Sequence, residues 1–187
     1  MTKLATGDRW MSWEGGVDLV AATHAGLPMP NVIVHVARLV HTPIGSAASG
    51  MVFFQPDPAG APLVMGFVST QPQIGRFFGP KIFAGTPFEQ APALDARIEI
   101  EVASTYVGAT VTVAGHVLRT RLEDLAAPEL TQRPPAAMTP FWQQGLESAA
   151  SRARLWVDGR EISILVPPVG ISGGPAAVFA PAGIYAR

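Results

Sequence analysis

Residues 31–41 read NVIVHVARLVH and contain four valines and one isoleucine, with no glycine or proline. A run of β-branched residues of this length without a breaker favours an extended strand over a helix. Apolar residues occupy both alternating faces of the run, which is typical of a strand that is covered on both sides. The stretch therefore predicts a long central strand, and the rest of the chain is interpreted around it.

Glycine and proline divide the flanking sequence into short apolar runs, which is the pattern of a mainly β protein. Downstream of the central strand the pattern predicts a turn at residues 46–50, strands at 51–55 and 63–70, and a loop at 56–62. Pro72 suits the first turn of a helix, so residues 73–78 are predicted to form a short helical turn.

Residues 95–102 and 108–121 predict a hairpin, because both segments alternate apolar and polar side chains. Pairing Glu101 with Thr110 sets the aliphatic side chains of one segment opposite those of the other. The same register gathers a polar row made of Arg97, Glu99, Glu101, Thr110, Thr112 and His116. This row either faces water as a set of cross-strand charge pairs or lines the interior of a barrel.

The C-terminal third combines one predicted helix with further strands. Residues 123–139 are rich in proline and alanine and are predicted to be irregular, and residues 140–152 are predicted to form a helix that begins with Pro140. A second hairpin is predicted over residues 154–166, where Asp-Gly at 158–159 suits a type I′ turn. Residues 176–186 are predicted to form a closing strand.

These patterns predict one mainly β domain over residues 1–187, since the chain has no internal repeat and no long linker. We expect an antiparallel curved sheet or barrel with one or two short helices.

The composition narrows the possible functions. The chain has no cysteine, which removes disulfides, thiolate catalysis and cysteine-ligated metals. Charged residues make up 14% of the chain and the formal net charge is −1, so no contact with nucleic acid or an anionic membrane is expected. The low charge density predicts a homo-oligomer that covers part of its surface, and the first ten residues lack an apolar run, which predicts a cytoplasmic location.

The four histidines form no recognisable metal motif. His35 and His41 share a face of one strand but lie roughly 20 Å apart, so they cannot hold one metal ion. No phosphate-binding loop, dinucleotide-binding pattern or serine-nucleophile motif is present. No metal and no cofactor is therefore expected, and the histidines are interpreted as packed or partly exposed side chains. If the polar row faces inward, Asp95 and His116 would form an acid–base pair across the hairpin.

Lys81 is the residue with the strongest case for chemistry. It is one of two lysines, and it lies in GRFFGPKIFAG, residues 75–85. Such a lysine is either a surface side chain or a buried amine. Burial disfavours the ammonium form, a neighbouring cation such as Arg76 disfavours it further, and a neutral amine attacks carbonyl groups to form Schiff bases.

The order of these features resembles the acetoacetate decarboxylase family. The resemblance begins with an extended strand at residues 32–41, a glycine-rich turn at 42–50 and a second strand at 63–70. It continues with a Gly-Arg segment at 75–76, Pro-Lys at 80–81 and a hairpin at 93–116, and it includes the terminal GIYAR at 183–187. In that family the first lysine after the proline forms the Schiff base, so the resemblance implies this role for Lys81. Ile82 and Phe77 stand where the family has a second lysine and a glutamate.

Three functions follow from these observations. The first is a lyase in which Lys81 condenses with a small oxo acid for decarboxylation, aldol or dehydration chemistry, and Arg76 disfavours the charged amine or holds a carboxylate. The substrate pocket would contain Phe78, Phe83, Glu99 and His116. The alternative is a non-catalytic β-barrel that binds a small apolar or aromatic ligand. The third is a structural subunit of a homo-oligomer.

Overall fold

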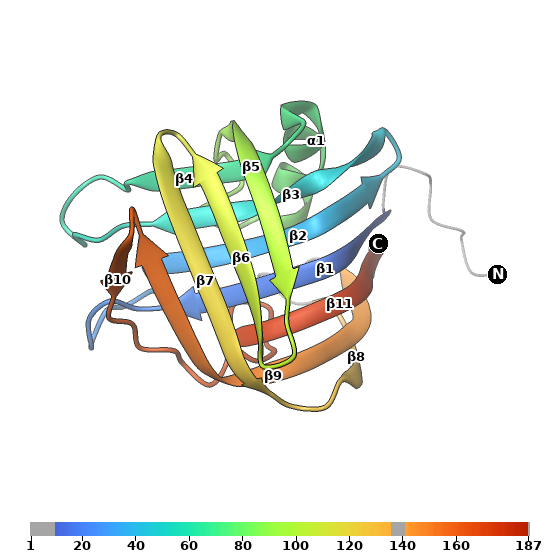
Figure 1. The fold of residues 1–187 in the computed structure, drawn as a ribbon. Helices are drawn as coiled ribbons and strands as arrows, with labels where there is room; N and C mark the ends of the chain where they lie inside the picture. Colours follow the sequence, from blue (N-terminus) through green and yellow to red (C-terminus); the bar gives the residue numbers. More distant parts are fainter. Residues whose placement is uncertain (1–9, 136–140, 187) are drawn as a thin grey trace.

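The computed structural model describes residues 10–135 and 141–186, which fold into one extensive curved sheet and a single helix within those ranges (Figure 1). The elements are β1 (Trp10–Ala21), β2 (Val32–Thr42), β3 (Gly45–Phe54), β4 (Val64–Ser69), α1 (Pro72–Ile82), β5 (Ala93–Val102), β6 (Tyr106–Val113), β7 (His116–Leu125), β8 (Glu129–Arg133), β9 (Trp142–Val157), β10 (Arg160–Ile162) and β11 (Ala177–Ala186). The expectation of a mainly β, curved and antiparallel sheet with little helix is confirmed.

Hydrogen bonding runs round the sheet as a ring. The strand order is β9-β11-β1-β2-β3-β4-β5-β6-β7, and β7 pairs again with β9. Every pairing is antiparallel except that of β4 with β5. The long strand β9 closes the ring, because its first half pairs with β11 and β8 while its second half pairs with β7 and β10.

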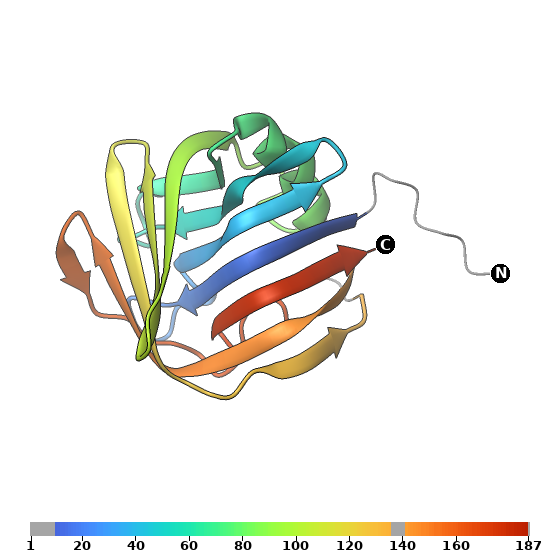
Figure 2. The same ribbon diagram turned by 45° about the vertical axis from the view of Figure 1, so that its right-hand side comes forward.

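The ring is flattened into two layers rather than open like a clean barrel. Strands β5, β6 and β7 cross in front of β1 to β4 (Figure 1), and the turned view separates the two layers (Figure 2). The space between them is filled by a core of side chains such as Leu19, Val34, Phe54, Val111 and Leu155. Burial of this apolar surface from both layers is the main term that stabilises the arrangement.

Strand β2 is central, as residues 31–41 predicted. It pairs with β1 on one side and β3 on the other. Val32, Val34 and Val36 point into the core between the layers. Ile33, Ala37 and Val40 point to the opposite face, into a second, helix-side core that also contains Trp13, Met51, Phe67, Phe78 and Tyr185. The apolar character of both faces of β2 thus reflects a sheet covered on both sides.

Helix α1 covers the second face of the sheet and is longer than the predicted helical turn. Pro72 occupies its first turn, and Ile74, Phe78 and Ile82 are buried at helical spacing. Gly79 allows the helix to approach the sheet, because a Cβ atom there would lie only 2.3 Å from the ring of Phe67.

The predicted helix at residues 140–152 is wrong, because most of this stretch belongs to β9; its first residue, Pro140, lies outside the described residues, as does Thr139. Burial in the first half of β9 alternates with period two: Gln143, Gly145 and Glu147 are buried while Trp142 and Leu146 are exposed. The long strand is held by partners on both edges, which override its weak local β preference.

Two further predictions need correction, and one strand was not predicted at all. Residues 46–50 are part of β3 and not a turn, and Gly50 packs there directly against the backbone of His35. The stretch 123–139 contains the end of β7 and strand β8, and its residues 136–139 lie outside the described residues. The chain also has an N-terminal strand, β1, which sequence patterns did not predict.

The first predicted hairpin is real, but its register is displaced by two residues. Thr110 lies opposite Glu99, and Glu101 lies opposite Gly108. A shift of two preserves the faces of both strands, so the separation of polar and apolar side chains survives. The segment 108–121 is also two strands, β6 and β7, joined by a turn at Ala114 and Gly115 with positive φ angles of 51° and 83°.

The closing strand and the turn of the second predicted hairpin are confirmed, but the second strand of that hairpin ends at Ile162 instead of residue 166. Asp158 and Gly159 have φ angles of 50° and 79°, the signs that a type I′ turn requires, and join β9 to β10. Strand β11 occupies residues 177–186 and closes against β1 and β9.

The close contact of α1 with the sheet gives a first prediction. Gly79→Ala adds a methyl group where the Phe67 ring already lies, so we expect the free energy of unfolding to fall by about 1–3 kcal/mol. Arg76→Ala, on the exposed face of the same helix, is the matched control and changes it by less than about 0.5 kcal/mol. Denaturant unfolding followed by circular dichroism measures both; equal effects would contradict the packing of α1 through Gly79.

Candidate ligand-binding site

Lys81 lies at the surface. Its side chain is exposed near the end of α1, its Nζ donates a hydrogen bond of 2.8 Å to the carbonyl oxygen of Phe77, and the same atom lies 3.8 Å from the centre of the Phe77 ring. The crevice beside it has a volume of only about 10 Å³. Of the two alternatives for Lys81, the structure therefore shows a surface side chain. The burial that the nucleophile hypothesis requires is not found.

The other residues predicted for the site are dispersed. Arg76 is exposed on α1. Glu99 is exposed on β5 and pairs with Arg97 at 2.6 Å. His116 is partly exposed at the start of β7 and is bonded through Nδ1 to Asp158 at 2.8 Å. The structure therefore does not bring Glu99 or His116 together with Lys81.

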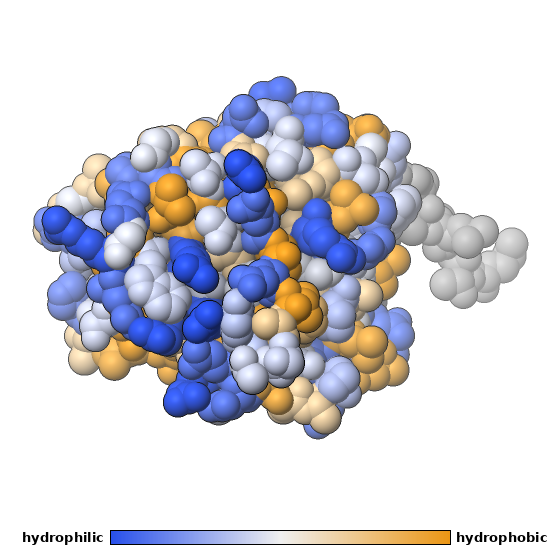
Figure 3. Space-filling view, in the orientation of Figure 1, coloured by the Kyte–Doolittle hydropathy of each residue, from blue (hydrophilic) through white to orange (hydrophobic). Residues whose placement is uncertain are grey.

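The polar row of the β5–β6 hairpin faces solvent. Arg97, Glu99 and Glu101 are all exposed, and hydrophilic side chains are spread over this face of the molecule (Figure 3). The alternative in which this polar row lines the interior of a barrel is therefore wrong. Asp95 does not lie opposite His116 either, since it pairs with Ser69 of β4.

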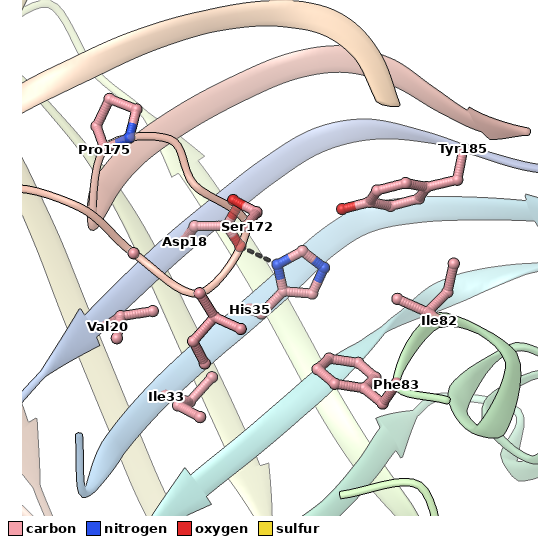
Figure 4. A pocket seen from close by; sticks show the side chains of 11 residues that line it. Asp18, Val20, Ile33, His35, Ile82, Phe83, Ser172, Pro175 and Tyr185 are labelled. Atoms are coloured by element: carbon pink, nitrogen blue, oxygen red, sulfur yellow. Dashed lines mark ion pairs between the residues drawn. The ribbon is translucent and has the colours of Figure 1, made fainter. Parts of the chain in front are cut away.

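A different cavity lies on the helix side of the sheet. Its volume is about 60 Å³, and it is bounded by β1, β2, β11, the end of α1 and the loop at residues 170–175 (Figure 4). Its walls include the apolar side chains of Val20, Ile33, Ile82, Phe83 and Ile171. Of the predicted pocket residues, Phe83 lines this cavity and Phe78 lines an adjoining crevice.

An aspartate–histidine pair forms the floor of the cavity. Asp18 of β1 lies directly opposite His35 of β2 in the antiparallel register, and both side chains point away from the core between the layers. The Asp18 carboxylate contacts Nδ1 of His35. The two side chains stay 26% and 32% exposed, so they remain accessible through the cavity.

The carboxylate of Asp18 favours the protonated form of the His35 imidazole. Burial disfavours the protonated ring, but the charge of Asp18 and its hydrogen bond together outweigh burial and hold the pKa of His35 above its ordinary value of 6.5.

Tyr185 supplies a second protic group. It belongs to β11, and in Figure 4 its hydroxyl points toward the His35 ring. Burial, followed by the nearby carboxylates of Asp18 and Glu147, raises the pKa of Tyr185 far above its usual range, and Arg133 offsets only part of this effect. The side chain is therefore a neutral phenol at any physiological pH and can donate a hydrogen bond.

Two polar atoms in the cavity are left without partners. Neither Nε2 of His35 nor the Tyr185 hydroxyl makes a hydrogen bond to any of the residues described. Polar groups in an apolar setting normally find partners. The cavity therefore offers two free polar groups within apolar walls, and its Tyr185 hydroxyl can hold one oxygen of a small ligand by donating a hydrogen bond.

A row of paired residues fixes the position of Tyr185. Met11, Tyr185, Gln143 and Arg133 lie opposite one another across β1, β11, β9 and β8. Arg133 is held by two hydrogen bonds of 2.5 Å to the carboxylate of Glu147, a bidentate ion pair that is mostly buried. The same guanidinium packs against Gly174, which supports the loop over the cavity.

Sequence patterns did not identify Asp18 or Tyr185, and they excluded a shared metal site for His35 and interpreted it as a packed or partly exposed side chain. A usable signal was present: Asp18 in GGVDLVAA and His35 in VIVHVA are single polar residues within stretches that are otherwise apolar. What the sequence lacked was the register that sets these two residues opposite each other.

A scan against protein-family models and searches of curated proteins and of solved structures found no match to this chain. The similarity to the acetoacetate decarboxylase family therefore stays a prediction. In residues 10–135 and 141–186, no helix is long and apolar enough to cross a membrane, and no three His, Asp or Glu side chains gather as metal ligands would.

The pairing of Asp18 with His35 predicts a pH-dependent contribution to stability. Because the pKa of His35 is raised in the folded state, this contribution is complete below the unfolded value of about 6.5 and is lost as the pH rises through the folded value. The difference in unfolding free energy between wild type and His35→Gln should thus be larger at about pH 6 than at about pH 8.5, by roughly 0.5–1 kcal/mol because the pair is partly exposed.

Urea unfolding at the two pH values measures this difference. In an Asp18→Asn background this excess at low pH should disappear and reverse in sign, because burial alone then lowers the pKa of His35. A wild-type difference that grows with pH, or an excess at about pH 6 that persists without Asp18, would contradict the pairing.

Proposed function

We propose that the protein binds a small, largely apolar or aromatic ligand that carries one carbonyl or hydroxyl oxygen, in the cavity over Asp18 and His35. The observation that carries the proposal is the presence of two unpartnered polar groups, on His35 and Tyr185, inside apolar walls. A ligand oxygen would accept the hydrogen bond of Tyr185, and the hydrocarbon part would lie against Ile33 and Phe83.

The energetic reason lies in hydrogen-bonding capacity that the protein leaves open to the cavity. A ligand oxygen would take up the Tyr185 donor, and a hydrogen bond of this kind contributes about 0.5–1.5 kcal/mol net. Apolar contact contributes further, at about 25 cal/mol for each Å² of surface removed from water. Together these terms favour a ligand that matches both the polar floor and the apolar walls.

The cavity is formed in advance of binding, which reduces the entropy lost by the protein. The loop at 170–175 is closed by hydrogen bonds from the amide of Gly170 to the carbonyl oxygen of Gly174 at 2.8 Å and from the amide of Gly173 to that of Gly170 at 3.1 Å. The contact of Arg133 with Gly174 also holds the loop in place. In a preorganised site of this kind, little of the binding free energy is lost to ordering of the chain.

A cavity-filling variant tests the proposal with phenylacetone, an aryl ketone, as the probe. Val20→Phe places a ring in the cavity, so it should weaken binding at least about tenfold, equal to about 1.4 kcal/mol. Lys81→Met changes a residue outside the cavity and should leave the dissociation constant within about twofold. Saturation-transfer NMR titrations give both values, with circular dichroism to show that the variants are folded.

The two variants also separate the proposal from its rivals. Binding that Lys81→Met abolishes and Val20→Phe spares would instead support a site at the amine. Absence of phenylacetone binding, together with absence of any co-purifying apolar ligand in native mass spectrometry, would overturn the proposal. A Schiff base on Lys81 remains a separate prediction, and borohydride trapping with a panel of oxo acids tests it.

A further inference from the structure

We propose that the cavity is also a proton-transfer site, in which His35 removes a proton from the carbon beside a ligand ketone and Tyr185 stabilises the resulting enolate. This inference rests on the proposed ligand binding and names its substrate class: ketones with an acidic α C–H bond. It is drawn from the placement of three side chains, Asp18, His35 and Tyr185, around one cavity.

The first element is an oriented base. Asp18 contacts Nδ1 of His35, so in the neutral ring the proton is assigned to Nδ1 and the lone pair to Nε2. Nε2 has no protein partner among the residues described, and Figure 4 shows the ring standing free in the cavity on that side. A carboxylate that fixes one nitrogen so that the other can accept a proton is the arrangement that general-base histidines require.

The second element is a neutral donor at the place where negative charge would develop. The Tyr185 hydroxyl points toward the His35 ring from β11, which lies on the other side of β1 from β2 (Figure 4). Its ring is held by Trp13, with centroids 4.8 Å apart, and by Phe141 at 6.4 Å, so the donor is fixed before any ligand arrives. Preorganised donors of this kind stabilise an oxyanion more than the ground-state ketone.

The remaining histidines lack this arrangement. Both ring nitrogens of His41 are occupied, Nδ1 by Ser46 at 2.9 Å and Nε2 by Glu14 at 3.0 Å. His116 is bonded to Asp158, whose carboxylate also accepts the amide hydrogen of Val117 at the hairpin turn. His24 is exposed beside Thr23. Those contacts account for His41 and His116 structurally, whereas the free nitrogen of His35 opens into a cavity.

The chemical step balances without a cofactor. Nε2 of neutral His35 takes the α proton, the C–H electron pair becomes a carbon–carbon double bond, and the carbonyl π pair moves onto oxygen. The enolate oxygen accepts the hydrogen bond of Tyr185, and the imidazolium is paired with Asp18. Return of a proton from Nε2 to the same carbon exchanges hydrogen, and return to a conjugated carbon isomerises the ketone.

The rate should rise with pH, because only the neutral imidazole is a base. The titratable groups that face His35 are Asp18 from β1 and Tyr185 from β11; Ile82 of α1 and Phe83 after it are apolar, and the loop contributes the neutral Ser172. Asp18 is the group that holds the pKa of His35 above 6.5. Asp18→Asn should therefore move the midpoint of the rate profile to lower pH, an effect that a merely structural role of Asp18 would not produce.

The test is hydrogen–deuterium exchange of the methylene group of phenylacetone in D₂O, followed by proton NMR with the full-length protein. His35→Gln should slow the catalysed exchange at least about 100-fold, and Tyr185→Phe about 10- to 100-fold. His41→Gln is the matched control, a histidine–carboxylate pair outside the cavity, and should leave exchange unchanged.

Each outcome decides between alternatives. Binding of phenylacetone without catalysed exchange overturns this inference and leaves the proposed ligand binding intact, whereas absence of binding overturns both. Exchange that is retained in folded His35→Gln also overturns it. Loss of exchange in Lys81→Met, together with an adduct that borohydride traps on Lys81 of the wild-type protein, assigns the proton transfer to an iminium on Lys81 instead.

Discussion

The register between β1 and β2 is the constraint on which the cavity depends. It sets Asp18 directly opposite His35 on the face that α1 covers, while their neighbours Leu19 and Val34 point into the core between the layers. Because side chains alternate along a strand, a shift of one residue would exchange the two faces. The many aliphatic side chains of the core therefore fix the position of one polar pair.

A charged pair in this position is not explained by stability. Removing two charges from water is costly, and apolar residues of similar volume in such places often stabilise a protein as well or better. The rest of the cavity wall is built from Val20, Ile33, Ile82 and Phe83. Burial lowers the pKa of His35, but the charge and the hydrogen bond of Asp18 together outweigh it and hold the pKa above its ordinary value. A polar floor under apolar walls is the composition of a site that orients a ligand.

Local sequence patterns were enough to predict those elements whose conformation depends on a few neighbouring residues. The central strand at 31–41, the Asp-Gly turn and the closing strand depend on runs of β-branched residues or on single turn residues. The helix predicted at 140–152 is in fact a strand, because β9 owes its conformation to pairing on both edges. For the site, only Phe83 among the predicted residues lines the cavity, while Asp18 and Tyr185 come from strands at opposite ends of the sequence.

The closure of the ring explains why a cavity forms at these strands. Tyr185 reaches the floor because β11 is inserted between β1 and β9, which joins residues 11, 185, 143 and 133 into one row. The row ends in the Arg133–Glu147 pair, whose guanidinium also supports the loop at Gly174. One set of strand pairings thus positions the phenol of Tyr185, places the carboxylates of Asp18 and Glu147 near it and supports the loop at residues 170–175 over the cavity. The proposed binding and proton-transfer site is therefore located on the sheet, beneath α1, whereas Schiff-base formation at the exposed Lys81 stays a separate prediction.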